Sequence, residues 1–149
     1  MSKIRITKSF TFETGHALYG YDGLCKNVHG HSYKLDVTVI GTPIKDKNHV
    51  KFGMVIDFKD LKKIVKEEIV DVFDHATVFN QNTPHVELAK TLEASGHKVL
   101  LVDYQPTSEE MVIDFAGKIM AKLPPSIILH NLRLQETATS FAEWFAADQ

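Results

Sequence analysis

Period-two alternation runs through the stretch His29-Gly30-His31-Ser32-Tyr33-Lys34-Leu35-Asp36-Val37-Thr38-Val39 and predicts a half-buried β-strand. Successive strand side chains point to opposite faces, so the odd-numbered residues of this stretch share one face. The sequence Gly41-Thr42-Pro43 indicates a turn directly after the strand. Both histidines are therefore expected to point the same way, at one end of an apolar row.

An earlier segment carries a third histidine with matching parity. Isoleucine and phenylalanine side chains from Ile4 to Phe12 share the parity of His16, which predicts another strand. If the two strands pair as neighbours, His16 reaches His29 and His31. Three imidazoles with an open fourth position are typical of a catalytic zinc site, although iron, nickel or copper would also accept them. We therefore predict a divalent metal, preferably Zn²⁺, on the three histidines.

Cys25 is the only cysteine, which excludes an internal disulfide and is typical of a reducing compartment. The segment from Gly20 to Asn27 is a polar, glycine-containing loop, so an inert buried thiol is disfavoured. The thiol is then either a fourth ligand that closes a structural zinc site, or a nucleophile or proton-transfer group beside the metal. The spacing to His29 leaves both interpretations open.

Length and composition limit the class of protein. The chain has 149 residues, 44% of them hydrophobic, and a formal net charge of -2, which predicts a single domain over residues 1–149. It has no basic run interleaved with aromatic residues, so a nucleic-acid partner has no support. No apolar stretch approaches the ~20 residues of a membrane span. The segment Met1–Arg5 lacks the apolar core of a signal peptide, which predicts a cytoplasmic location.

Helical periodicity and capping signals predict three helices. Asp57, Thr83 and Thr107 are suitable N-caps, and the last begins a capping-box pattern with Glu110. The helices are expected from about Phe58 to Phe73, from Pro84 up to Gly96, and from Thr107 up to Pro124. Strands are expected at residues 4–16, 29–39, 98–104, 127–137 and 140–145. The predicted class is α+β, an antiparallel sheet with helices on one face.

Six blocks of the sequence occur in the order seen in a known enzyme family. They are His16, Cys25-x-x-x-His29-Gly30-His31, Val55-Ile56-Asp57-Phe58, Asp74-His75, Pro106-Thr107-Ser108-Glu109 and Gln135-Glu136-Thr137. In these blocks the chain resembles the family of 6-pyruvoyl-tetrahydropterin and 6-carboxy-tetrahydropterin synthases over nearly its whole length. The resemblance implies the tunnelling fold (T-fold), with a barrel built by oligomerisation into a homohexamer of two stacked trimers and active sites at subunit interfaces.

The resemblance also implies roles for individual residues. The three histidines match the zinc ligands, and Cys25 matches the catalytic thiol. Asp74 and His75 match the pair that handles protons in the same site. Glu136 matches the carboxylate that anchors the pterin ring. Thr107 and Ser108 match polar residues that hold the pterin.

The implied substrate is 7,8-dihydroneopterin triphosphate, which the family uses in two ways. One enzyme makes 6-carboxy-5,6,7,8-tetrahydropterin, acetaldehyde and triphosphate for queuosine-type deazapurine synthesis. The other eliminates triphosphate and forms 6-pyruvoyl-tetrahydropterin. Three residues separate Cys25 from His29, which resembles the carboxy enzymes, because the pyruvoyl enzymes tend to have a longer insertion there. We therefore expect the carboxy product, a carbon–carbon lyase reaction, with the pyruvoyl product as the alternative.

Structural interpretations stand beside the functional ones. Asp74 and His75 could cap a helix end, and Thr107 and Ser108 could be helix caps only. Glu136 shares the face of apolar residues, so it could be a structural acid that is paired with another polar group. A zinc protein closed by the three histidines and Cys25 would be a non-catalytic module, which is the second alternative.

Two features depart from the family pattern or are left without an assignment. The stretch from Asn80 to Pro106 is longer than in the shorter carboxy enzymes, and an altered substrate fit or subunit contact is expected from it. Lys26 and Arg133 are candidates for binding the triphosphate, only because they are close in sequence to proposed site residues.

Overall fold

Two long strands form the centre of the sheet. The computed structural model describes residues 1–149, in which β1 (Ile4–His16) and β2 (His29–Gly41) pair antiparallel over their full length. His16 lies directly opposite His29. Phe12 and Tyr33 are partners in the same register and are both buried. The predicted pairing of the two histidine-bearing strands is therefore confirmed.

The sheet has six strands in the order β4-β3-β1-β2-β5-β6. β5 (Ile128–Thr137) and β6 (Ser140–Phe145) continue antiparallel from β2. β3 (Ala76–Asn80) and β4 (Val99–Val102) join parallel on the other side of β1. The predicted α+β class is confirmed, but the sheet is mixed rather than wholly antiparallel. Helix α3 (His85–Ala94) connects β3 to β4 as a crossover, and such a connection makes neighbouring strands parallel.

Two of the three predicted helices begin at their predicted caps, whereas α3 begins one residue late, at His85, with Pro84 and not Thr83 as its N-cap. The run expected from Phe58 to Phe73 is helical throughout, as α1 (Phe58–Val65), a π-helical turn (Lys66–Val70) and α2 (Asp71–Phe73). Helix α4 spans Ser108–Met120. The side chain of Asp57 accepts from the backbone N–H of Lys59, and that of Thr107 accepts from Glu110. Two short 3-10 turns complete the chain, Leu24–Lys26 and Ala146–Asp148.

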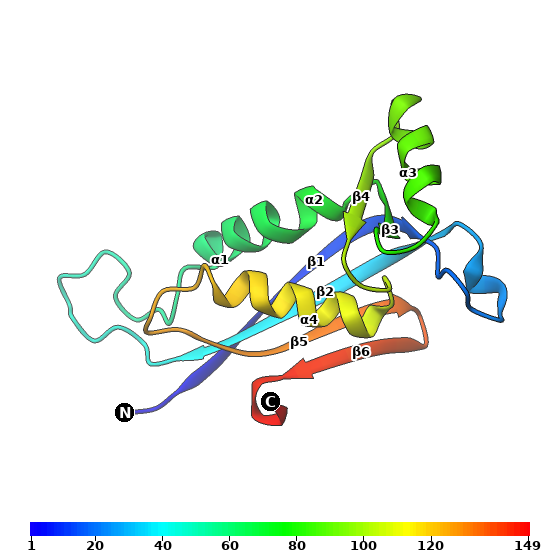
Figure 1. Ribbon diagram of the computed structural model, residues 1–149. Coiled ribbons are helices and arrows are strands. Elements are labelled where there is room, and N and C mark those ends of the chain that lie inside the picture. The colour runs from blue at the N-terminus through cyan, green and yellow to red at the C-terminus, as the bar shows by residue number, and fades with distance from the viewer.

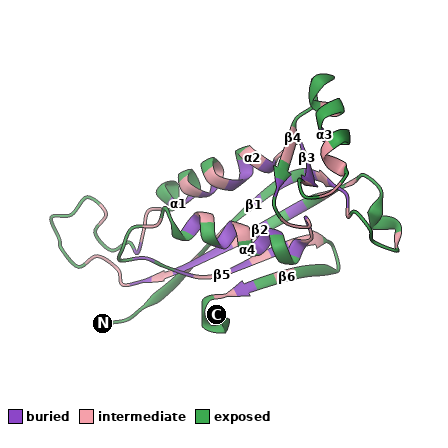
Figure 2. Ribbon diagram, in the orientation of Figure 1, coloured by how far each residue is buried: buried purple, intermediate pink, exposed green.

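The main core lies between one face of the sheet and the helices α1, α2 and α4. The prediction of helices on one face only is wrong for α3, because its Ala89 packs in a separate cluster with Phe79, which alternates with the core-facing Val78. Figure 1 shows α1, α2 and α4 along the same side of the long strands. Phe115 of α4 packs its ring 4.9 Å from that of Phe73 and 6.2 Å from that of Phe12. Buried residues line this layer, whereas the outer helix surfaces are exposed (Figure 2). Glu13, Ser32 and Lys34 are exposed on the opposite, uncovered face of the sheet, an arrangement common in sheets packed on one side.

None of the helices combines the length and the apolar character needed to cross a membrane.

Candidate metal centre and active site

Three imidazoles meet at the ends of β1 and β2 on the helix-covered side of the sheet. The Nε2 atoms of His16 and His29 are 3.1 Å apart. With His31, these residues offer ligand atoms that all lie within 4.8 Å of one another. His16 is buried, and the other two are half-buried. The strand parity that predicted this cluster is therefore confirmed.

Hydrogen bonds fix the protonation of two of these rings. His16 Nδ1 lies 2.6 Å from the Pro106 carbonyl oxygen, and His29 Nδ1 lies 2.6 Å from that of Asn27. A carbonyl oxygen only accepts, so each Nδ1 carries a proton, and in the neutral form of each ring the Nε2 atom is bare. Burial lowers the pKa of His16 and of His31, which favours their neutral forms. When both rings are neutral, two lone pairs therefore face each other at 3.1 Å.

This arrangement fits a bound divalent cation. A tetrahedral zinc site with Zn–N bonds of 2.0–2.1 Å separates its ligand atoms by about 3.3 Å, close to the observed Nε2 separation. Histidine ligands commonly donate their second N–H to a carbonyl or carboxylate, as His16 and His29 do here. The donor set suits zinc and also other first-row metals.

A cavity of about 460 Å³ opens beside the cluster. Its lining includes five of the predicted site residues: His16, Cys25, Thr107, Ser108 and Glu136. Cys25 is exposed in the 3-10 turn, and its carbonyl accepts from the Leu18 N–H at 3.0 Å. The Ser108 hydroxyl is buried without a hydrogen-bond partner. The structure thus gathers a thiol, a carboxylate and two hydroxyls around the proposed metal ligands.

Glu136 lies against the histidine cluster. Its Oε1 is 3.3 Å from His31 Nε2 and 3.5 Å from His16 Nε2. Leu132 and Leu134 of the same strand are fully buried, so the predicted alternation places Glu136 on their face. The partner expected for this acid is therefore the histidine cluster.

Asp74 and His75 lie elsewhere in the chain. Their side chains pair at 2.9 Å, and Asp74 Oδ1 also accepts from the Glu13 N–H. That backbone hydrogen bond, with a smaller contribution from His75, lowers the pKa of the Asp74 carboxyl. Asp74 is also the C-cap residue of α2, as the structural interpretation of this pair required.

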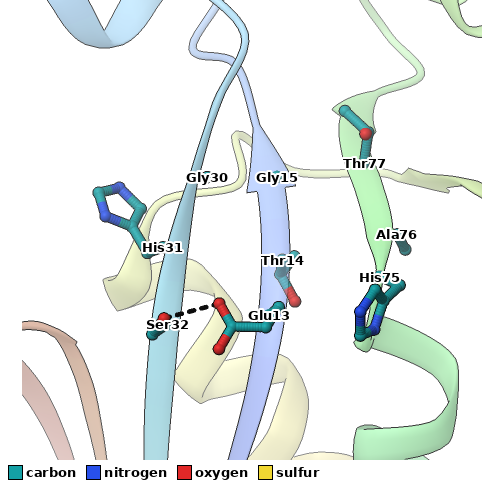
Figure 3. Close-up of a pocket in the computed structure, with 9 residues that line it drawn as sticks. All are labelled: Glu13, Thr14, Gly15, Gly30, His31, Ser32, His75, Ala76 and Thr77. Atoms are coloured by element: carbon teal, nitrogen blue, oxygen red, sulfur yellow. Dashed lines mark hydrogen bonds between the residues drawn. The ribbon is translucent and has the colours of Figure 1, made fainter.

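The His75 side chain borders a hollow of about 300 Å³, together with Glu13, Gly15, Gly30 and Thr77. Figure 3 shows these residues where β1, β2 and β3 lie side by side. Gly15 and Gly30 face each other across β1 and β2, and both lack the side chain that would fill the space. Ala76 and Val78 are buried towards the helices, so the intervening Thr77 lies on the uncovered face. Within one chain, the structure does not bring His75 to the cavity of Cys25.

The two triphosphate candidates differ in position. Lys26 is exposed next to Cys25, at the end of the 3-10 turn. Arg133 stacks its guanidinium 3.6 Å from the centre of the Phe141 ring. Because Arg133 lies between the inward-facing Leu132 and Leu134, it is on the face of the sheet away from the histidines. Arg133 therefore does not reach the cavity, although it is close to Glu136 in the sequence.

Sequence reasoning missed one residue beside the histidine cluster and two residues of the cavity. Tyr33 continues the parity of His29 and His31, and its ring lies 5.6 Å from that of His31. Gln105 and Tyr19 line the cavity, and Gln105 Nε2 donates to the Tyr19 carbonyl at 3.0 Å. The parity of the strand could have identified Tyr33. No local pattern signals Gln105, which shows that the long segment from Asn80 to Pro106 reaches the cavity.

Comparisons with known proteins agree with this geometry. The sequence model of the family described as 6-pyruvoyl tetrahydropterin synthase matches residues 5–147. The chain is 39% identical to a Haemophilus influenzae protein named 6-carboxy-5,6,7,8-tetrahydropterin synthase, over 94% of this chain and 97% of that relative. A Rickettsia bellii protein of the same name is 31% identical, over 94% of this chain and 99% of that relative.

Solved structures show the same fold. An uncharacterized protein from Wolinella succinogenes matches with a TM-score of 0.80 and 19% identity, over 98% of this chain and 99% of that one. The 6-pyruvoyl tetrahydropterin synthase of Caenorhabditis elegans matches with a TM-score of 0.69 and 24% identity, over 98% and 97%. The T-fold expected for the single chain is therefore confirmed. On the family match and these relatives, the chain belongs to the 6-pyruvoyl tetrahydropterin synthase family.

Proposed function

We propose that this chain is a zinc-dependent 6-carboxy-5,6,7,8-tetrahydropterin synthase. It would convert 7,8-dihydroneopterin triphosphate to 6-carboxy-5,6,7,8-tetrahydropterin, acetaldehyde and triphosphate, in queuosine-type deazapurine synthesis in the cytoplasm. The observation that carries the proposal is the single cavity that joins Cys25, Glu136 and the metal ligand His16. The names of the Haemophilus and Rickettsia relatives favour the carboxy product, as do the three residues between Cys25 and His29.

The groups in the cavity suit this chemistry. When bound, a zinc ion would supply a Lewis acid that lowers the pKa of substrate hydroxyls and stabilises negative charge on their oxygens. Cys25 and His75 act as the acid and base that move protons along the substrate side chain. Asp74 orients the His75 imidazole and stabilises its charged form. Glu136 accepts hydrogen bonds from the ring N–H and amino groups of the pterin. Thr107 and the unpartnered Ser108 hydroxyl hold the ring.

The position of His75 supports a shared site. Its side chain is 76% exposed and lies on the face of the sheet away from Cys25. We therefore propose that Asp74 and His75 of one copy serve the cavity of a neighbouring copy in a homohexamer built from two trimers. An active site completed in this way needs the oligomer for turnover.

Product analysis tests the reaction. The zinc-loaded protein is incubated with 7,8-dihydroneopterin triphosphate, the pterin is identified by mass spectrometry, and acetaldehyde is assayed in parallel. Acetaldehyde with the 6-carboxy product is expected. A 6-pyruvoyl product without acetaldehyde would indicate the pyruvoyl enzyme instead. Cys25→Ala is the control, and it should lose turnover while it keeps its zinc. Bound zinc without any conversion by the wild type would favour the non-catalytic structural site.

Mixed oligomers test the shared site. Cys25→Ala and His75→Ala are each expected to be inactive. When the two variants are assembled together in equal amounts, a site is complete only where one copy supplies Cys25 and its neighbour supplies His75. Random mixing would restore about a quarter of the sites. Separately assembled variants mixed without subunit exchange are the control. No recovery in the mixed oligomers would place both residues in the same chain's site.

A further inference from the structure

The Glu136 carboxylate lies at metal-ligand spacing from two of the three clustered histidines. Oε1 lies 3.3 Å from His31 Nε2 and 3.5 Å from His16 Nε2, and the latter atom lies 3.1 Å from His29 Nε2. In a tetrahedral zinc site with Zn–N and Zn–O bonds of about 2.0–2.2 Å, ligand atoms lie about 3.3–3.5 Å apart. The oxygen therefore has the separation of a fellow ligand from His16 and from His31.

Neutral His16 cannot donate a hydrogen bond to Glu136. The ring proton of neutral His16 is on Nδ1, where the Pro106 carbonyl accepts it, so Nε2 offers only a lone pair to the carboxylate. His31 Nε2 is buried and has no hydrogen-bond partner, although Oε1 is 3.3 Å away. An unprotonated ring nitrogen and a carboxylate oxygen repel one another at these distances unless a cation lies between them.

The backbone explains how Glu136 reaches this position. The pairing of β5 with β6 shifts register between Gln135 and Thr137, the two residues that flank Glu136. Regular alternation already places Glu136 on the face of Leu132 and Leu134, and irregularities of this kind are common beside active sites. The Glu136 side chain is 27% exposed and also lines the cavity. It therefore has space to move between the metal position and the cavity.

We propose that, in the substrate-free protein, the Glu136 carboxylate is the fourth metal ligand, and that it leaves the metal when it takes hold of the pterin ring. The proposal rests on the proposed function. Four protein ligands close a metal site, whereas catalysis needs an open position. One carboxylate then couples recognition of the pterin to opening of the metal, so that the metal stays covered until substrate arrives.

The test uses protein loaded with Co²⁺, because the visible absorption of this ion reports its ligands. Glu136→Gln is compared with Glu109→Gln, which makes the same charge change in a residue of the same cavity. Glu136→Gln is expected to change the absorption spectrum and to weaken metal binding by about tenfold or more in chelator competition. Glu109→Gln should match the wild type in both. Circular dichroism checks that each variant is folded.

Three outcomes distinguish the possibilities. A Glu136→Gln variant that keeps the wild-type spectrum and affinity would overturn the inference while leaving the histidine site intact. Equal metal binding by wild type and His29→Ala would instead remove the metal centre on which the proposed function depends. In a Cys25→Ala background, which prevents turnover, addition of 7,8-dihydroneopterin triphosphate should change the spectrum. The double variant Cys25→Ala, Glu136→Gln should show a smaller spectral change with this substrate, because it has no carboxylate to release. An equal spectral change in the single and the double variant would count against release of the carboxylate.

Discussion

Replacing Thr107 by alanine should separate a structural role from a functional one. Thr107 is the N-cap of α4, with φ -80° and ψ 161°, and its hydroxyl accepts from the Glu110 N–H at 3.2 Å. Loss of such a cap lowers the free energy of unfolding by about 1 kcal/mol. For a chain of this length, that corresponds to a fall in Tm of about 2–4 °C.

The same hydroxyl lines the cavity, so its loss should also lower activity. A neutral hydrogen bond to the substrate contributes about 0.5–1.5 kcal/mol, which corresponds to a fall in kcat/KM of up to about tenfold. Thr107→Ser keeps the hydroxyl and should preserve both properties. Thr107→Asp keeps a good cap but adds negative charge beside Glu109 and Glu136. It should therefore preserve stability and lose activity.

Urea denaturation followed by circular dichroism measures the first property, and steady-state assays of pterin formation measure the second. The capping argument is refuted if Thr107→Asp is as unstable as Thr107→Ala, or if Thr107→Ala unfolds at the wild-type urea concentration. The substrate-binding argument is refuted if Thr107→Asp retains wild-type kcat/KM.

Other substitutions test the metal centre, the core and an ion pair. Zinc at about 100 times its Kd should stabilise the wild type by about 2.7 kcal/mol in thermal unfolding, whereas His29→Ala should show no such effect. Phe115→Ala should lower the free energy of unfolding by about 3–5 kcal/mol, whereas exposed Ile113→Ala should change it by less than about 0.5 kcal/mol. A hydrogen bond from Lys51 lowers the pKa of the Asp57 carboxyl. The ionised carboxylate therefore stabilises the fold above the usual pKa of an aspartate, and this stabilisation is lost as the pH falls through the lowered pKa. Asp57→Asn, which keeps a cap, should therefore show a weaker loss of stability in acid than the wild type.

The features that the sequence predicted are those set by local patterns. Parity along β1 and β2 was enough to bring His16 to His29 and His31, because the two strands pair over their whole length. Asp57 and Thr107 were predictable as caps, because a cap depends on residues within one helical turn. The cavity could be anticipated only through the family resemblance, since its walls come from four separate segments of the chain.

The features that the sequence did not predict depend on contacts between distant segments. β3 has five residues and no clear alternation, and its pairing with β1 joins residues 14–16 to 76–78. The direction of this pairing is set by the chain path through α1 and α2, which precede β3. The face on which His75 lies follows from that pairing, so it could not be obtained from the pair Asp74-His75 alone. Arg133 was misplaced for a simpler reason, because alternation along β5 turns it away from Glu136.

His75 has a conformation that formation of the core does not explain. Its φ of 61° is uncommon for a residue other than glycine, and such a backbone costs about 1–3 kcal/mol. Its N–H donates to the Glu13 carbonyl at 2.6 Å, and the Glu13 N–H donates to Asp74, so β1 holds the pair in place. The imidazole nevertheless lies mostly in solvent. A conformation that is strained, firmly held and of no use to the chain's own core points to a role outside it, which is the reason for placing His75 in a neighbour's active site.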